Sequence, residues 1–439
     1  MAASRNRLPA DLFAGSAALL QAHLPAGAEL WVGLSGGRDS VVLLHLCQRL
    51  WPRVRAIHVH HGLSPHADAW VDFCQALCRE RQIPLSVVRV QVEDRAGRGL
   101  EAAAREARYR AYRESGAGYL ALGHHRQDQV ETLLFNLCRG TGVAGAAAMP
   151  ACRRRDDLVL LRPLLAWAPA DLDHYARARG LAWVEDESNR DVRYSRNYLR
   201  REILPRLAQH FPGVEASLAR AAGHFAEAQE LLDELARQDD VRIGARRELL
   251  LQLSPARQAN WLRWWLRQAG WQVPDAAAAT EWLRQLAEAG TEARVELPLP
   301  QGWVRLWQGG LYRVPRQEPP RSCVWDGRGV LDWGGAQLRL LPALGEGLSQ
   351  ARLAGRMLEV RLRQGGESLC PGPGRPRRPL KKLLQESGIP PWERQTLPLL
   401  YVEGELVACV GVALAAGWQC GVGEPGWLPT LAPGLNPGP

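Results

Sequence analysis

A short segment rich in glycine and hydroxyl side chains carries the clearest chemical signal in the sequence. It reads SGGRDS and consists of Ser35, Gly36, Gly37, Arg38, Asp39 and Ser40. Two glycines let backbone N–H groups approach phosphate oxygens without interference from Cβ atoms. The serine hydroxyls can donate hydrogen bonds to a pyrophosphate group, and the Asp39 carboxylate can hold the Mg²⁺ that neutralises it. The segment therefore predicts a phosphate-binding loop, with an ordinary helix-capping turn as the alternative.

The scarcity of lysine excludes the commoner ATP loops. Of the 55 lysine and arginine residues, only Lys381 and Lys382 are lysine. A Walker A loop needs a lysine after glycine, and a kinase needs one in a V-A-I-K strand; neither is present. An ATP-using enzyme with this sequence must therefore hold its phosphates by another loop. The net charge of +9 favours a polyanionic partner, with a solvated basic surface as the alternative.

The elements around the SGGRDS loop are typical of a parallel sheet covered by helices. Apolar runs predict strands, and helical segments follow or separate them. Ligands bind at the carboxyl ends of parallel strands, which is where this loop falls, and the next helix points its positive end at the same anion. The fold class predicted for this part is α/β with a doubly wound parallel sheet. The expected strands are Leu30–Leu34, Ala56–His60, Leu85–Val90 and Tyr119–Leu122, and the expected helices are Val41–Leu50, Glu101–Glu114 and Gln127–Cys138.

The pattern changes at about Glu202, so further domains are expected. Helical periodicity marks 216–238, 255–270 and 276–289, and the proline-rich segment 314–322 is a plausible linker. Beyond it, short runs such as 336–341 and 359–362 alternate with glycine and proline. We predict an α/β domain over 1–205, a helical domain over 206–315 and a small β-containing domain over 322–439.

Cysteine usage and hydropathy bear on the compartment. The nine cysteines contain no C-x-x-C pair, which argues against zinc sites and redox motifs. An odd count without a secretory signal predicts reduced thiols in the cytoplasm. The longest uncharged apolar run, Val407–Trp418, is too short to span a bilayer, so no membrane contact is expected. The sequence leaves the oligomeric state open, a homodimer included.

The SGGRDS segment resembles the SGGxDS signature of the N-type ATP pyrophosphatases of the PP-loop superfamily. These enzymes split ATP between its α and β phosphates and activate an oxygen as an adenylate. GMP synthetase, NAD synthetase, argininosuccinate synthetase and several tRNA-modifying enzymes share the signature. It indicates the reaction type better than the substrate.

Further blocks in the same order resemble the tRNA(Ile)-lysidine synthases. They span about 170 residues and are more specific together than any one alone. Near the far end, segments 363–367, 381–384 and 389–400 resemble the C-terminal domain of the longer family members. The blocks of the first half are His58–Leu63 (HVHHGL), Ala104–Tyr109 (AREARY), Gly123–Thr132 (GHHRQDQVET), Arg162–Leu165 (RPLL), Asp186–Asn189 (DESN) and Arg196–Arg200 (RNYLR).

The resemblance implies a carbon–nitrogen ligase that uses ATP and Mg²⁺. Its substrates are free L-lysine and a tRNA(Ile) with a CAU anticodon. The C2 oxygen of the first anticodon cytidine attacks the α-phosphorus, pyrophosphate leaves, and the ε-amine of lysine then displaces AMP to give lysidine. The first domain would be the ATP-pyrophosphatase domain, and the helical and C-terminal domains would hold the tRNA, largely through its phosphates.

The same resemblance assigns residues to roles. Asp39 and Asp128 are expected to hold Mg²⁺, since Gln127 stands where the family usually has another aspartate. Arg105 is expected to grip phosphate or the adenylate. A helix-capping role for Asp128 and a packing role for His124 are the alternatives. The residues expected on the substrate or tRNA side are His124, Asp186, Asn189, Arg196, Arg200, Lys381 and Lys382.

Two other functions remain as alternatives. A tRNA thiolase of the same superfamily needs sulfur-carrying cysteines or an iron–sulfur cluster, and the nearest pair, Cys74 and Cys78, does not fit. A non-catalytic tRNA-binding protein would have a decayed ATP loop, and the intact Ser35, Asp39, Ser40 and Asp128 argue against such decay.

Overall fold

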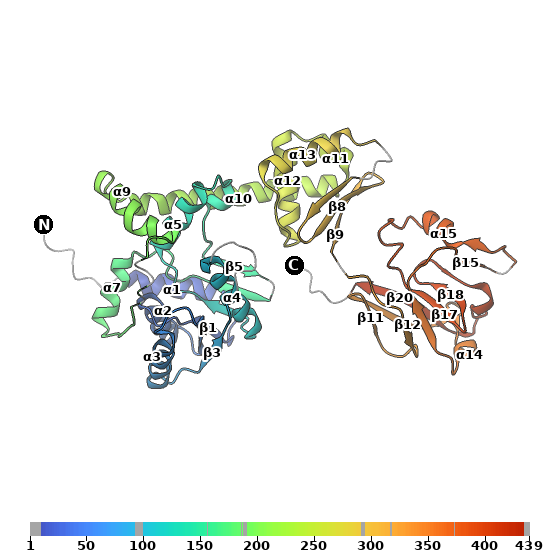
Figure 1. The fold of residues 1–439 in the computed structure, drawn as a ribbon, viewed down its shortest axis with the longest axis horizontal. Coiled ribbons are helices and arrows are strands. Elements are labelled where there is room, and N and C mark those ends of the chain that lie inside the picture. The colour runs from blue at the N-terminus through green and yellow to red at the C-terminus, as the bar shows by residue number, and fades with distance from the viewer. Residues whose placement is uncertain are drawn as a thin grey trace. The chain divides into compact units, whose positions relative to one another are not determined.

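The structure is a computed structural model, and it divides the chain into two compact units, Met1–Glu234 and Leu235–Pro439. Figure 1 shows the helices and strands of each unit. The residues that the structure describes are 10–92, 100–155, 157–185, 187, 191–290, 295–316, 318–372 and 374–433.

A six-stranded sheet forms the centre of the first unit (Figure 1), with the strand order β3-β2-β1-β4-β6-β5. Strand β5 is antiparallel to β6, and the other neighbouring strands are parallel. The predicted doubly wound α/β fold is confirmed. The β5–β6 hairpin was not predicted. The strands are β1 (Leu30–Gly33), β2 (Val54–His60), β3 (Leu85–Arg89), β4 (Tyr119–Ala121), β5 (Cys152–Arg155) and β6 (Leu158–Leu161).

Alternating residues of the strands divide the sheet into two buried faces. On the α2 face, Leu30 and Val32 of β1 share a core with helices α1, α2, α3 and α7. On the α4 face, Trp31 shares a core with Tyr112 of α4. Successive residues of a strand face opposite sides, so a sheet covered by helices on both faces needs apolar residues on both sides. Burial of each leucine side chain stabilises the fold by roughly 1.5–3 kcal/mol. The helices are α1 (Ala10–His23), α2 (Arg38–Leu50), α3 (Ala67–Glu80), α4 (Leu100–Glu114) and α7 (Pro169–Ala178).

A second group of helices packs around α5 in the first unit. Leu133 of α5, Ala146 of α6 and Ala222 of α10 form a small core of their own. The long helix α10 contains the boundary between the two units. The elements are α5 (Arg126–Leu137), α6 (Val143–Ala146), α8 (Ser195–Tyr198), a π-helical turn (Leu199–Ile203), α9 (Leu204–His210) and α10 (Val214–Ile243).

The second unit begins with helices that share a core with a small antiparallel sheet, β7-β8-β9. The predicted helices are present, and Trp261 at the centre of this core is fully buried. The three strands were not predicted, because their alternating runs are only four to six residues long. The elements are α11 (Arg247–Leu251), α12 (Pro255–Gln268), α13 (Ala276–Glu288), β7 (Glu296–Leu299), β8 (Gly302–Trp307) and β9 (Gly310–Pro315).

The rest of the second unit is built mainly of strands, as predicted. A five-stranded sheet has the order β10-β14-β17-β18-β19 and a four-stranded sheet the order β11-β12-β20-β13. The main elements are β10 (Cys323–Trp325), β11 (Leu331–Trp333), β12 (Ala336–Leu344), β13 (Leu348–Ser349), α14 (Gln350–Leu353), β14 (Leu358–Arg361), β15 (Ser368–Leu369), β16 (Arg378–Pro379), α15 (Leu380–Glu386), β17 (Leu399–Val402), β18 (Glu405–Cys409), β19 (Ala413–Leu414) and β20 (Pro425–Pro433).

Candidate functional site at the carboxyl edge of the first sheet

The SGGRDS loop joins β1 to α2 and is held by its own serines. Ser40 donates from its hydroxyl to the carbonyl of Gly37 at 2.8 Å, and Ser35 donates to the Ser40 hydroxyl at 3.1 Å. The backbone N–H of Gly37 donates to the Ser35 hydroxyl at 3.3 Å. In this conformation the two hydroxyls shape the loop, so donation to a phosphate would require them to rotate.

Two glycines allow the tight packing around this loop. Gly36 has φ of +90°, and a Cβ atom there would lie 2.9 Å from a methyl group of Val184. Gly123, which follows β4, lies against the first turn of α2, where a Cβ would meet the backbone of Asp39 at 3.1 Å. Gly36 therefore needs glycine, and Gly123 lets the end of β4 pack closely against the loop.

His125 connects the two carboxylates that were predicted to hold metal. Its Nε2 atom lies 3.5 Å from Oδ2 of Asp39, and its Nδ1 atom lies 3.5 Å from Oδ2 of Asp128. The backbone N–H of His125 also donates to Asp128 at 2.9 Å, so Asp128 caps the helix that it begins. Arg38 pairs with the other oxygen of Asp39 at 2.8 Å. The structure thus brings Asp39 and Asp128 together around one imidazole ring.

The charges of this cluster shift the pKa values of its members. Burial raises the pKa of Asp39, but hydrogen bonding and charge from His125 and Arg38 outweigh it, so the net pKa is lowered. Burial lowers the pKa of His125, yet the two carboxylates outweigh it and the net pKa is raised. Asp39 is therefore held as a carboxylate and His125 is favoured as its cationic partner.

A third acidic residue, Glu131, is linked to this cluster through Arg200. Glu131 is 1% exposed and accepts two hydrogen bonds from Arg200, at 2.5 and 3.0 Å. Arg200 also pairs with Asp128 at 3.1 Å. Burial raises the pKa of Glu131, and Arg200 acts against this. Arg200 was predicted to lie on the substrate side, and Glu131 was not predicted as a site residue, although it follows Asp128 by three residues on the same face of α5.

His124 and His125 point to opposite faces of the sheet edge. His125 meets Asp39 on the α2 side, whereas His124 lies among the positive charges of Arg105, Arg162 and Arg196. Burial lowers the pKa of His124 to about 3; the charge of Asp128 acts against this shift, and the three arginines add to it. His124 was the predicted site residue, but His125 is the histidine that lies within 3.5 Å of both predicted metal-binding carboxylates.

The other predicted residues fall in three groups. Asp186 and Asn189 lie outside the described residues. Lys381 and Lys382 are exposed on α15 in the second unit. Arg196 lies in α8 and contributes to the positive potential at His124.

The HVHHGL and AREARY blocks meet beside the loop. His58 is buried, and its Nδ1 atom lies 2.8 Å from the carbonyl oxygen of Leu34, the residue before the SGGRDS loop. Arg108 donates from Nε to His61 at 3.1 Å. These contacts fix the end of β1 and the face of α4 relative to each other.

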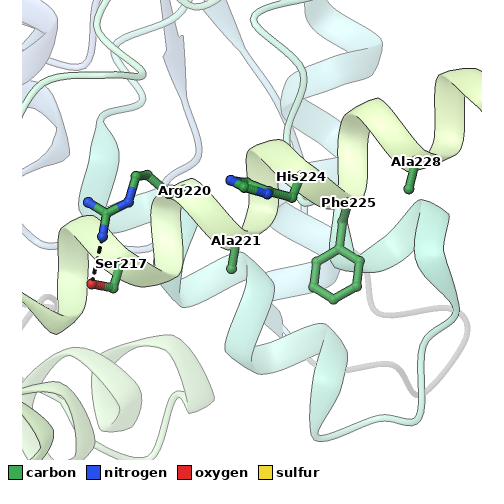
Figure 2. Close-up of a pocket in the computed structure, with 6 residues that line it drawn as sticks. All are labelled: Ser217, Arg220, Ala221, His224, Phe225 and Ala228. Carbon is green, nitrogen blue, oxygen red and sulfur yellow. Dashed lines mark hydrogen bonds between the residues drawn. The ribbon is translucent and has the colours of Figure 1, made fainter.

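A shallow hollow of about 490 Å³ lies along α10, away from the predicted side chains. Figure 2 shows its wall, with Arg220 hydrogen bonded to Ser217 and the Phe225 ring on another side of the helix. None of the predicted site residues lines it, so the candidate site is defined by side-chain contacts. The hollow is lined by Ser217, Arg220, Ala221, His224, Phe225 and Ala228.

Among the described residues, no cluster of three or more histidine, cysteine or acidic side chains has the geometry of a complete metal site. The nine cysteines are free. In the described part of the chain, no helix has both the length and the apolar character needed to cross a bilayer.

Comparisons with known proteins cover most of the chain. A PP-loop domain model matches residues 16–207, a TilS substrate binding domain model 246–312, and a TilS substrate C-terminal domain model 358–431. The chain is 43% identical to the tRNA(Ile)-lysidine synthase of Azoarcus sp. (strain BH72), over 94% of each chain. It is 39% identical to that of Nitrosomonas europaea, over 98% of each. Among solved structures, the U34-tRNA thiolase NcsA from Methanococcus maripaludis matches with a TM-score of 0.41 and 19% identity, over 49% of this chain and 78% of that one.

Proposed function

The chain belongs to the tRNA(Ile)-lysidine synthase family, and we propose that it uses ATP to ligate free L-lysine to C2 of the first anticodon cytidine of a CAU-anticodon tRNA(Ile). The single observation that carries the proposal is the meeting of Asp39, His125 and Asp128 beside the SGGRDS loop. That cluster lies at the carboxyl ends of β1 and β4, where an open α/β sheet binds its ligands.

The residues present suit a magnesium ion that is shared with a nucleotide. Mg²⁺ in such enzymes is usually held by one or two carboxylates together with substrate phosphates and water. Asp39 and Asp128 supply two carboxylates, and the pKa of Asp39 is lowered, so it is ionised at neutral pH. When bound there, Mg²⁺ would neutralise charge on the departing pyrophosphate.

The chain's own groups then account for the first chemical step. The backbone N–H groups of Gly36 and Gly37 and the start of α2 would bind the pyrophosphate, with the N–H of Gly37 leaving its contact with Ser35. The cytidine C2 oxygen forms a bond to the α-phosphorus while the bond between the α and β phosphates breaks. The electron pair of that bond leaves with pyrophosphate, where loop amides stabilise it.

The second step needs an uncharged amine. The ε-amine of lysine attacks C2, AMP leaves, and the amine loses a proton. Arg105 is proposed to hold the adenylate, and His124, Asp186, Asn189, Arg196 and Arg200 to lie on the substrate side. The regions 206–315 and 322–439, with Lys381 and Lys382 exposed on the latter, are proposed to bind the tRNA through its phosphates.

The thiolase alternative is less well supported. Cys74 is buried, and burial raises the pKa of its thiol to about 12, which suppresses the thiolate that sulfur transfer requires. Cys78 is also buried, with a pKa raised to about 11.

The decisive experiment is incorporation of labelled lysine into a CAU-anticodon tRNA(Ile) in the presence of ATP and Mg²⁺. We expect each modified tRNA to carry one labelled lysine, with the release of one AMP and one pyrophosphate. The mass of the tRNA should increase by the mass of lysine less one water. Exchange of oxygen for sulfur would establish the thiolase instead. Binding of tRNA by active protein without any ATP turnover would establish the non-catalytic alternative.

A further inference from the structure

On the α4 face, Arg105, which is proposed to hold the adenylate, lies in a cluster whose other members have no assigned ligand. Arg105 and Tyr109 lie one turn apart on α4, with Nη2 of Arg105 at 3.4 Å from the Tyr109 hydroxyl. Arg162 follows β6 and is 3% exposed. Its Nη1 atom donates to the carbonyl of Pro150 at 2.7 Å, whereas its Nε–H is buried without an acceptor among the described residues. A buried donor without an acceptor is costly, which marks a position where a ligand acceptor is missing.

Strand alternation explains why these residues gather there. Leu158 and Leu160 of β6 face the α4 side, so Arg162, two residues further on, continues on that side. The same alternation, continued past the end of β4, puts His124 on the α4 side and His125 on the α2 side, where His125 meets Asp39. His124 and Arg162 therefore share the α4 side, and the charge of Asp128 also acts on His124.

The positive charge continues along the neighbouring edge strand. Arg153 of β5 lies directly opposite Leu160 of β6, and residues paired in this way share a face. Arg153 is exposed, and its charge acts on Arg162 together with that of Arg105. Arg154 lies opposite Val159 and thus belongs to the other face. Among the described residues, the structure gives neither Arg105 nor Arg162 an acidic side chain as a partner.

We propose that Tyr109 and Arg162, extended by Arg153, bind a phosphodiester group of the RNA substrate next to Arg105. The proposal rests on the proposed function, because it assumes a tRNA substrate. Phosphate is the anion that suits guanidinium forks, since its oxygens can accept from Nε and a terminal nitrogen together. The line of charge runs toward the sheet edge at β5 and away from β1, which favours a polyanionic strand over the triphosphate of the SGGRDS loop.

The test measures tRNA binding and ATP binding separately on the full chain. We expect R162Q to weaken binding of CAU-anticodon tRNA(Ile) roughly tenfold without ATP present. The slope of log K against log salt should fall by about 0.7–0.9 for the phosphate contact that is lost. ATP affinity without RNA should be unchanged. R153Q should weaken tRNA binding in the same direction, whereas R154Q, which removes the same charge from the other face of the same strand, should have a smaller effect.

Three outcomes would overturn the proposal. If R162Q loses ATP affinity but keeps tRNA binding, the cluster binds a phosphate of ATP and not one of the RNA. Unchanged binding of both ligands in R162Q and R153Q would make the cluster structural only, and equal effects of R153Q and R154Q would show non-specific attraction. If R162Q fails to fold in thermal melts, Y109F and R153Q decide the question. Lysine incorporation by the wild-type protein tests the proposed function independently, since tRNA binding can depend on this subsite even if no lysine is added.

Discussion

The imidazole of His125 forms an ion pair with Asp39 at 3.5 Å and faces Asp128 at the same distance from its other nitrogen. One ring therefore spans the two carboxylates that the proposed chemistry requires. Replacing Asp39 and replacing His125 should therefore have different effects on activity, so mutation can distinguish the role of the acid from that of the histidine.

Replacement of Asp39 by alanine should abolish lysine incorporation, by about a thousandfold or more, because the leaving pyrophosphate loses its metal carboxylate. Binding of tRNA should survive. Labelled-lysine incorporation and a filter-binding assay measure the two properties. Asp68→Ala, which removes an exposed carboxylate of the same unit, is the matched control and should keep activity. Retained incorporation in Asp39→Ala would refute the metal role.

Replacement of His125 by glutamine should lower activity by about ten- to a hundredfold, since it removes a group that orients both carboxylates. It should also move the acid limb of the pH–activity profile to higher pH. His125 lowers the pKa of Asp39, so its removal lets Asp39 take up a proton at a higher pH. An acid limb that stays in place would contradict the coupling of the two residues.

Replacement of Arg200 by methionine should lower the free energy of unfolding of the first unit by about 3 kcal/mol, because it leaves the buried Glu131 carboxylate without its partner. Urea unfolding measures the change. The double variant E131Q/R200M should recover part of the loss, as it removes the unpaired charge. If R200M is as stable as the wild type, the ion pair contributes nothing to folding.

Replacement of Gly36 by alanine should reduce activity at least about a hundredfold, because the new Cβ meets Val184 at 2.9 Å in a backbone conformation that disfavours side chains. Gly116→Ala is the control, since Gly116 has φ of +78° with no atom within 4 Å of the new Cβ. That variant bears the backbone strain alone and should lose stability but little activity. Equal losses of activity in the two variants would argue against a specific loop geometry.

His45 should make the first unit less stable in acid. Burial lowers its pKa from 6.5 to about 4, and its neutral Nδ1 lies 2.9 Å from the Tyr175 hydroxyl. Above pH 6.5 the neutral ring does not reduce the free energy of unfolding. As the pH falls from 6.5 toward 4, the free energy of unfolding decreases progressively, because the unfolded chain takes up the proton first. Thermal melts across this range should show a shallower pH dependence for His45→Gln; identical slopes would exclude His45 as a cause.

Much of the first domain could be predicted because its strands are buried on both faces. Runs such as Leu30–Leu34 are then uninterrupted apolar segments, and the loop after each must lie at the ligand-binding edge. The arginine-rich strand β5 gave no such signal, since it is an edge strand with exposed side chains. The choice between His124 and His125 depends on the phase of alternation past the end of β4, which composition and spacing do not reveal. Arg162 begins the RPLL block, yet nothing in the sequence indicates that its Nε atom is buried without an acceptor.

The pair of exposed residues at the start of α15 has a practical consequence. Lys381 and Lys382 carry every side-chain amine of the chain. Except for the α-amino group of the chain, an amine-directed fluorophore would therefore attach only to α15. It would report on that part of the molecule without any engineered cysteine. Protection of these two amines by tRNA would map a footprint with a single reagent.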